Sequence, residues 1–120
     1  MDVNTIVTDL AQSLAQRNLR VVFAESCTAG LVSATLSRVP GISEYLCGSA
    51  VVYRDQTKQD WLSVAEADIE RETSVSETVA RQMAIGVMKK TSEADYAVSI
   101  TGHVGPDAPA DLDGPVSYTQ

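Results

Sequence analysis

The sequence has few of the residues that mark extracellular or metal-binding proteins. Its two cysteines, Cys27 and Cys47, are too few for a disulfide scaffold, and two thiols are most simply interpreted as free thiols in a reducing cytosol. The single histidine, His103, cannot build a site of several histidines, and the sequence has no CxxC or HExxH motif. We therefore expect a cytoplasmic protein without a metal or other cofactor.

Long apolar runs and an excess of positive charge are also absent. No apolar run approaches the roughly 18–20 residues that a membrane span needs, and the first residues lack the pattern of a signal peptide. Nine Lys and Arg side chains stand against sixteen Asp and Glu, a net charge of −7. Because nucleic-acid binding needs a basic surface for the phosphates, we expect neither a nucleic-acid nor a membrane partner. A small anionic ligand in a local pocket remains compatible with this charge.

The composition that remains is that of an ordinary globular domain, with 120 residues, 44% of them hydrophobic and 21% charged. Helical periodicity or a short helix is predicted for residues 3–17, 31–39, 55–62 and 79–88. Strands are predicted for residues 19–25, 45–53 and 96–100, and the start of a fourth for 115–120. Alternating strands and helices predict an α/β fold: a single three-layer domain with a mostly parallel or mixed sheet and flanking helices.

Two short stretches have the form of a helix capping box, in which a serine begins the helix and a glutamate follows three residues later. These are Ser63 with Glu66 and Ser74 with Glu77. Each pattern predicts that its serine is the residue that caps a helix.

Two segments of small and polar residues, Glu25–Gly30 and Thr101–Pro106, follow predicted strands. Ligands in α/β folds bind beyond the carboxyl ends of strands, so these two loops are the first places to look for a site. Between a strand and a helix, small residues let backbone N–H groups approach an anion or an oxyanion. Neither the phosphate-binding GxxxxGK[ST] motif nor the glycine pattern of a dinucleotide site is present. By itself, the first loop is more typical of an ordinary strand-to-helix turn.

The first loop offers three possible nucleophiles, Ser26, Cys27 and Thr28. A serine needs a base, and His103 is one candidate. The other is Lys58, if burial keeps its amine neutral. Because most lysines are exposed to solvent, the residues alone leave this choice open.

Six stretches that occur in order along the chain resemble motifs of one family. They are ESCTAG at 25–30 (similar to ESCTGG), VPGIS at 39–43 (VPGAS), residues 48–58 (GVVxYSNxxK), LSV at 62–64 (LGV), VSETVARQMA at 75–84 (VSEEVAxxMA) and TGHVGP at 101–106 (TGIAGP). Over residues 5–118 the chain resembles the CinA C-terminal domain, the nicotinamide-nucleotide amidase family.

The resemblance implies a metal-free Ser/Lys amidohydrolase that converts nicotinamide mononucleotide to nicotinic acid mononucleotide and ammonia. By position, Ser26 would attack the amide and Lys58 would act as the base, while Cys27 is the second candidate nucleophile. The residues implied to bind this small-molecule nucleotide are Glu25, Cys27, Thr28, Ala29, Gly30, Tyr53, Thr101 and Gly102.

The chain departs from the family pattern in three places. Ala29 replaces a glycine, which matters if the position needs a positive φ. Residues 105–116, with three aspartates, stand where the family has GPGGGTPEKPVG, and acidic residues oppose phosphate binding. By the resemblance, the family's last strand and helix are missing, which favours a homo-oligomer or another partner. The alternative function is therefore a catalytically impaired nucleotide-binding, regulatory or interaction domain of the same fold.

Overall fold

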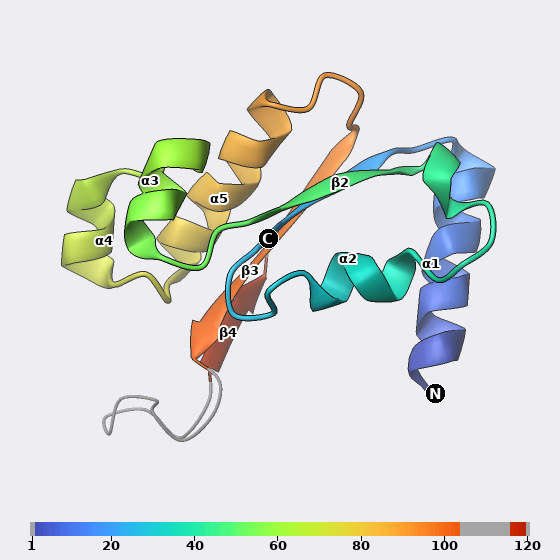
Figure 1. The fold of residues 1–120 in the computed structure, drawn as a ribbon, viewed down its shortest axis with the longest axis horizontal. Helices are drawn as coiled ribbons and strands as arrows, with labels where there is room; N and C mark the ends of the chain where they lie inside the picture. Colours follow the sequence, from blue (N-terminus) through green and yellow to red (C-terminus); the bar gives the residue numbers. More distant parts are fainter. Residues whose placement is uncertain (1, 104–115, 120) are drawn as a thin grey trace.

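The computed structural model describes residues 2–103 and 116–119 (Figure 1). Its elements, in chain order, are α1 (Val3–Arg17), β1 (Val21–Glu25), α2 (Leu31–Leu36), the 3₁₀ turn η1 (Ile42–Glu44), β2 (Leu46–Val51), α3 (Asp55–Leu62), α4 (Glu66–Glu72), α5 (Glu77–Lys89), β3 (Tyr96–His103) and β4 (Val116–Thr119). Every predicted helix and strand is therefore present. Residues 115 and 120 of the predicted fourth strand lie outside the described residues.

The sheet has the strand order β2-β1-β3-β4. β1 is parallel to both β2 and β3, whereas β4 is antiparallel to β3, so the predicted mixed sheet is confirmed. Because β1, β2 and β3 run in the same direction, their carboxyl ends meet at one edge of the sheet. This edge is where the predicted functional residues are expected to gather.

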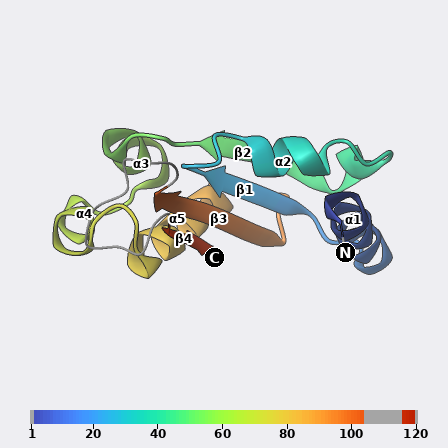
Figure 2. The ribbon, with the colours of Figure 1, turned by 90° about the horizontal axis from the view of Figure 1, so that it is seen from below.

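Helices cover both faces of the sheet, and β1 is buried between them. Val22 and Ala24 pack with residues of α3 and α5 in one core cluster, among them Met83. Val21 and Phe23, which point to the other face, pack with α1, α2 and η1 in a second cluster. In Figures 1 and 2, α1 and α2 lie on one side of the strands and α3, α4 and α5 on the other. The three-layer α/β fold is thus confirmed.

Several element boundaries differ from the predictions. α2 ends at Leu36 rather than at residue 39, and β3 continues through His103 instead of ending at residue 100. Both capping predictions are wrong. Ser63 is the C-cap of α3 with φ +59°, and its N–H donates to Gln59, so it closes one helix instead of opening the next. The N-cap of α5 is Ser76, which accepts a hydrogen bond from the amide of Val79.

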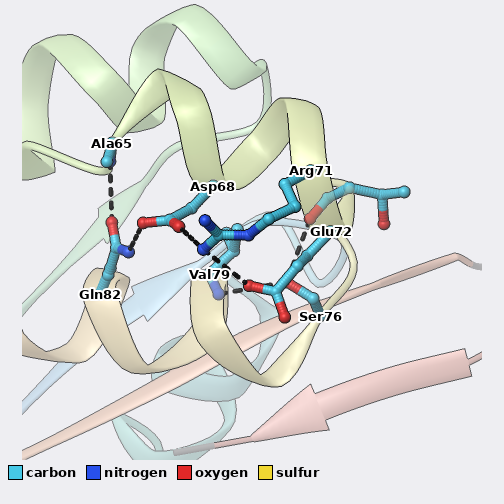
Figure 3. A network of polar contacts seen from close by, with 8 residues as sticks. Ala65, Asp68, Arg71, Glu72, Ser76, Val79 and Gln82 are labelled. Carbon is cyan, nitrogen blue, oxygen red and sulfur yellow. Dashed lines mark hydrogen bonds and ion pairs between the residues drawn. The ribbon is translucent and has the colours of Figure 1, made fainter.

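A network of polar contacts fastens α4 to α5 (Figure 3). The side chain of Gln82 on α5 accepts from the amide of Ala65 and donates to Asp68, and Asp68 also pairs with Arg71. After α4 the chain passes through Thr73, whose φ of +70° and ψ of 163° belong to a region that glycine normally occupies. The network therefore joins α4 to α5, and the connection between the two helices includes this unfavourable conformation at Thr73.

Among the described residues, no helix has both the length and the apolar character needed to cross a bilayer.

Candidate functional site

The ends of β1, β2 and β3 bring the predicted site residues to one edge of the sheet. Glu25, the last residue of β1, is paired with Val51 of β2 and with Ile100 of β3. Beyond it, the amide of Val52 donates to the Glu25 carbonyl and the amide of Ser26 donates to the Ile100 carbonyl, both at 2.9 Å. Ser26 therefore lies in the middle of this edge, between the chain that leads to Tyr53 and the chain that leads to Thr101.

Ser26 is only 6% exposed and begins the loop that connects β1 to α2. Its carbonyl accepts from the amide of Ala29 at 3.0 Å. Within the described residues, the amides of Cys27, Thr28 and Gly30 make no backbone hydrogen bond. N–H groups that donate to no backbone carbonyl are available as the donors that a tetrahedral oxyanion requires, and two of them, those of Cys27 and Thr28, also lower the pKa of the Cys27 thiol.

The loop contains two consecutive residues in the left-handed conformation, Ala29 with φ +50° and Gly30 with φ +97°. Gly30 adopts this conformation without cost, whereas a Cβ in this region costs roughly 1–2 kcal/mol. The position of Ala29 is thus one that favours glycine, which is the condition under which the departure from the ESCTGG pattern matters. Contacts with surrounding side chains hold the loop in this strained conformation.

The buried carboxylate of Glu25 makes several of these contacts. It is 0% exposed and accepts five hydrogen bonds: from the Thr28 hydroxyl at 2.8 Å, the Val32 amide at 2.9 Å, the Ser33 amide at 3.0 Å, the Ser33 hydroxyl at 2.7 Å and the Ser49 hydroxyl at 2.9 Å. Burial, the largest influence, raises the pKa of Glu25, but the hydrogen bonds from Ser33, Thr28 and Val32 together outweigh it and lower the pKa to about 2. Both oxygens are occupied, so Glu25 organises the loop, and its role in substrate binding stays a prediction.

Lys58 lies on α3 and is 2% exposed, although it is a lysine. Its Nζ donates to the Tyr53 carbonyl at 3.0 Å and lies 3.5 Å from Oδ1 of Asp55. Burial lowers the pKa of Lys58, and the charge of Asp55 opposes this shift only in part. A buried amine with a lowered pKa has the property that a lysine base needs.

Lys58 and the Ser26 loop belong to the same edge of the sheet. Lys58 contacts the carbonyl of Tyr53, and Tyr53 directly follows Val52, whose amide donates to the Glu25 carbonyl. The charge of Lys58 also lowers the pKa of the Cys27 thiol. Within residues 2–103, no hydrogen bond joins the Lys58 amine to the Ser26 hydroxyl. The proposed roles of the two side chains thus stay predictions, supported by their place at one edge.

Cys27 is half-buried beside Ser26. Burial raises the pKa of its thiol, and this outweighs the backbone amides and Lys58, which lower it. Because the thiolate is the nucleophilic form of cysteine, this environment favours the hydroxyl of Ser26 over the Cys27 thiol as nucleophile.

The other predicted residues differ in exposure. Tyr53 is 62% exposed, whereas Thr101 is 1% exposed and its hydroxyl donates to the Ser74 carbonyl at 2.8 Å. Thr101, Gly102 and His103 belong to β3, so the prediction of a loop starting at Thr101 is wrong: the pairing of β3 with β4 extends the strand. Because Glu25 pairs with Ile100, Ser26 follows β1 at the height where Thr101 follows Ile100 on β3. His103 is two residues further along β3, a distance of about 7 Å in the strand direction. The rest of this loop, 104–106, and the aspartates at 107–113 lie outside the described residues.

Sequence reasoning missed the residues that support the site, among them Ser33, Ser49, Ser74 and Asp55. No local pattern links Ser49 to Glu25 across 24 residues, because only strand pairing brings them together. A cavity between β2, α3 and the end of α5, which includes Cys47 and Trp61, contains neither Ser26 nor Lys58. Among the described residues, no group of three His, Cys, Asp or Glu side chains is arranged to hold a metal ion.

Comparisons with known proteins agree with the fold and the motifs. Residues 3–116 match the family model of the CinA C-terminal domain. A CinA-like protein of Prochlorococcus marinus (strain MIT 9301) is 42% identical over 106 residues, which cover 88% of this chain and 25% of that protein. A CinA-like protein of Desulfotalea psychrophila is 40% identical over 105 residues, again 88% of this chain and 25% of that protein. The chain thus spans about a quarter of the length of these curated relatives.

Solved structures show the same likeness. A competence-damaged protein (CinA) superfamily protein from Escherichia coli is 30% identical with a TM-score of 0.82, covering 95% of this chain and 73% of that one. A competence/damage inducible protein from Agrobacterium tumefaciens is 29% identical with a TM-score of 0.90, covering 100% of this chain and 74% of that one.

Proposed function

Because the chain belongs to the CinA C-terminal domain family, we propose that it is a metal-free amidohydrolase acting on nicotinamide mononucleotide. Hydrolysis of the nicotinamide amide yields nicotinic acid mononucleotide and ammonia. Both the substrate class and the roles of Ser26 and Lys58 come from the resemblance of the ordered motifs, and the arrangement around Ser26 supports the roles.

In this mechanism the Ser26 hydroxyl attacks the amide carbonyl while Lys58, with its amine neutral, accepts the hydroxyl proton. The N–H groups of Cys27, Thr28 and Gly30 donate to the oxyanion that forms. Collapse of the tetrahedral intermediate breaks the C–N bond, and the proton held by Lys58 leaves with ammonia. Water then hydrolyses the acyl-serine and restores the Ser26 hydroxyl.

The observation that carries the proposal is the burial of Lys58 beside the serine loop. A lysine that is 2% exposed is rare, and its charged form is destabilised there even though Asp55 lies 3.5 Å away. The lysine side chain, unlike a structural hydrophobic residue, costs stability at this position. A role in proton transfer gives a reason for that cost.

One contact favours a second candidate, a domain that binds a nucleotide without hydrolysing it. In the structure the Lys58 amine donates to the Tyr53 carbonyl, and within the described residues no hydrogen bond joins it to the Ser26 hydroxyl, a contact that catalysis requires. If substrate does not bring about this change, the fold retains a nucleotide site without turnover.

The test is the release of ammonia from nicotinamide mononucleotide by the wild-type chain and by Ser26→Ala and Lys58→Met. We expect a loss of roughly a hundredfold to ten-thousandfold in kcat for Lys58→Met, as for removal of a general base, and a loss at least as large for Ser26→Ala, which removes the nucleophile. Lys90→Met is the matched control, because Lys90 is an exposed lysine at the end of α5, and we expect its replacement to leave kcat unchanged. Binding of the nucleotide by calorimetry without ammonia release supports the second candidate. Equal turnover by wild type and both variants contradicts the Ser/Lys mechanism.

A further inference from the structure

The Glu25 carboxylate joins three segments of the chain that surround Ser26. Its two oxygens accept from the loop at Thr28, from the first turn of α2 at Val32 and Ser33, and from β2 at Ser49. The backbone of Glu25 is itself fixed in the middle of the sheet, since it is paired on both sides. The side chain therefore ties the start of the loop to its far end and to the neighbouring strand.

We propose that Glu25 is the positioning residue of the nucleophile: its carboxylate joins the loop at residues 26–30 to the first turn of α2 and so sets the place of Ser26 and of the amides that follow it. The inference rests on the proposed function, because a nucleophile is what the loop presents. It gives Glu25 a role different from substrate contact, which its occupied oxygens disfavour.

The geometry of Ser26 supports this role. Its amide is held by the Ile100 carbonyl at 2.9 Å, which fixes the side facing the sheet. The Ser26 carbonyl accepts from the amide of Ala29 at 3.0 Å, and Ala29 belongs to the same loop. The position of this part of Ser26 therefore depends on how firmly the loop is held. The loop ends in α2, a helix of six residues, which is too short to be stable by itself and has no side-chain cap at Gly30. The carboxylate of Glu25 supplies the missing cap by accepting from the Val32 and Ser33 amides.

A carboxylate suits this position better than a neutral side chain of the same size. All five contacts are donors, and an ionised carboxylate offers only acceptors. Glutamine would turn an NH₂ group toward at least one N–H or O–H donor, and it would remove the negative charge that a helix N-terminus favours. The proposal therefore predicts that charge and reach at position 25 are both required.

The experiment compares Glu25→Gln with two milder changes at Ser49, a residue that touches neither Ser26 nor Lys58 through any hydrogen bond in the described part of the chain. Ser49→Ala removes one donor to the carboxylate, and Ser49→Thr retains the hydroxyl as the rescue variant. Ser37→Ala is the control, because it removes a hydroxyl that donates to Ala34 at the opposite end of α2. Each variant is assayed for kcat and KM with nicotinamide mononucleotide and for its folded fraction.

Misplacement of a reacting group by about 1 Å costs about a hundredfold in rate, so we expect Glu25→Gln to lower kcat by at least that factor. Ser49→Ala should lower kcat about tenfold with KM within about twofold of wild type, because the loop shifts only in part and binding groups elsewhere remain. Ser49→Thr and Ser37→Ala should match wild type. A role limited to folding predicts a lower folded fraction but an unchanged kcat per folded molecule, and that result for Ser49→Ala and Glu25→Gln overturns the proposal.

A second readout separates this proposal from the assignment of substrate. A fluorophosphonate reacts with an activated serine: the Ser26 Oγ–P bond forms, the P–F bond breaks, fluoride leaves and the hydroxyl proton passes to Lys58. Mass spectrometry of the labelled peptide gives the rate at Ser26. Labelling of wild type without amide hydrolysis overturns the substrate assignment, and slower labelling of Glu25→Gln and Ser49→Ala then still supports the positioning role. Hydrolysis with labelling rates equal to wild type in both variants overturns the positioning role alone. Neither labelling nor hydrolysis by wild type overturns both.

Discussion

Glu25 and Lys58 are two buried ionisable side chains at the same edge of the sheet, yet the surroundings stabilise the charged form of Glu25 and destabilise that of Lys58. Both are almost fully buried, at 0% and 2% exposure. Glu25 accepts five hydrogen bonds and its pKa falls to about 2, so its charged form is stabilised. Lys58 has one carbonyl and one more distant carboxylate, and burial lowers its pKa, so its charged form is destabilised. A buried charge whose hydrogen-bond partners are all present stabilises the fold, whereas a buried group with few partners loses its charge more easily and is suited to proton transfer.

The largest effect should come from Glu25→Gln, which removes the satisfied charge. Several donors then lose a charged acceptor in a buried place, and hydrogen bonds to charged groups contribute about 1.5–3 kcal/mol each, so we expect a loss of about 3 kcal/mol or more in the free energy of unfolding. Urea unfolding followed by circular dichroism measures it. Glu77→Gln is the control, because Glu77 is an exposed glutamate on α5 paired with Arg81, and its loss should cost under about 1 kcal/mol. Equal losses for the two variants would contradict the comparison.

The charge of Glu25 should also make the stability of the protein depend on pH in the acid range. Because the folded-state pKa of Glu25 is lowered from 4.5 to about 2, its contribution is fully present above pH 4.5 and is lost as the pH falls toward 2. Wild-type stability should therefore fall over this range more steeply than that of Glu25→Gln. Parallel pH dependence in the two proteins would show that Glu25 is not held in its charged form.

Lys58→Met should have the opposite character, with a small effect on folding and a large one on activity. The variant loses the hydrogen bond to Tyr53 but no longer buries an amine, so its free energy of unfolding should lie within about 1 kcal/mol of wild type at neutral pH. Since the folded-state pKa of Lys58 lies below 10.5, the unfolded chain binds more protons between the two values, and wild-type stability should rise with pH there. Lys58→Met should lack that rise. A large loss of stability at neutral pH would mean that Lys58, like Glu25, is a structural charge.

Asp55→Asn should sharpen the comparison by removing the negative charge beside Lys58. Asp55 stands where the motif GVVxYSNxxK has asparagine, and its carboxylate raises the pKa of Lys58 against the effect of burial. Removing that charge lowers the lysine pKa further, so the amine is neutral at lower pH. The midpoint of the rise of kcat with pH should therefore move to lower pH. Asp60→Asn, which changes an exposed aspartate on the same helix that contacts Gln56, is the control. An unmoved midpoint, or one moved to higher pH, would contradict a lysine base.

The sequence predicts the helices and strands around this pair better than the surroundings of either charged side chain, and the reason is physical. Helices and strands follow from periodicity, which is local, so α1 and α3 have the predicted bounds. Burial of Lys58 is not local: a lysine after a strand is usually exposed, so the residues alone left it one of two candidate bases and the resemblance favoured it. The contacts of Glu25 depend on strand pairing that brings Ser49 beside it and on a helix turn eight residues away. Caps at Ser63 and Ser74 failed for a similar reason, since the packing of α4 on α5 decides where those helices begin.

The smallest effect is expected at Ala29, and it tests whether Glu25 imposes the conformation of the loop. A non-glycine residue at φ +50° costs roughly 1–2 kcal/mol, but glycine also loses more conformational entropy on folding, so Ala29→Gly should stabilise the chain by about 1 kcal/mol or less. In a Glu25→Gln background the loop is no longer held in the left-handed conformation, and the gain should shrink. Urea unfolding of the two single variants and the double variant measures this coupling. An equal gain in both backgrounds would show that the left-handed turn is independent of the carboxylate, and Glu25 would then stabilise α2 without setting the path of the loop.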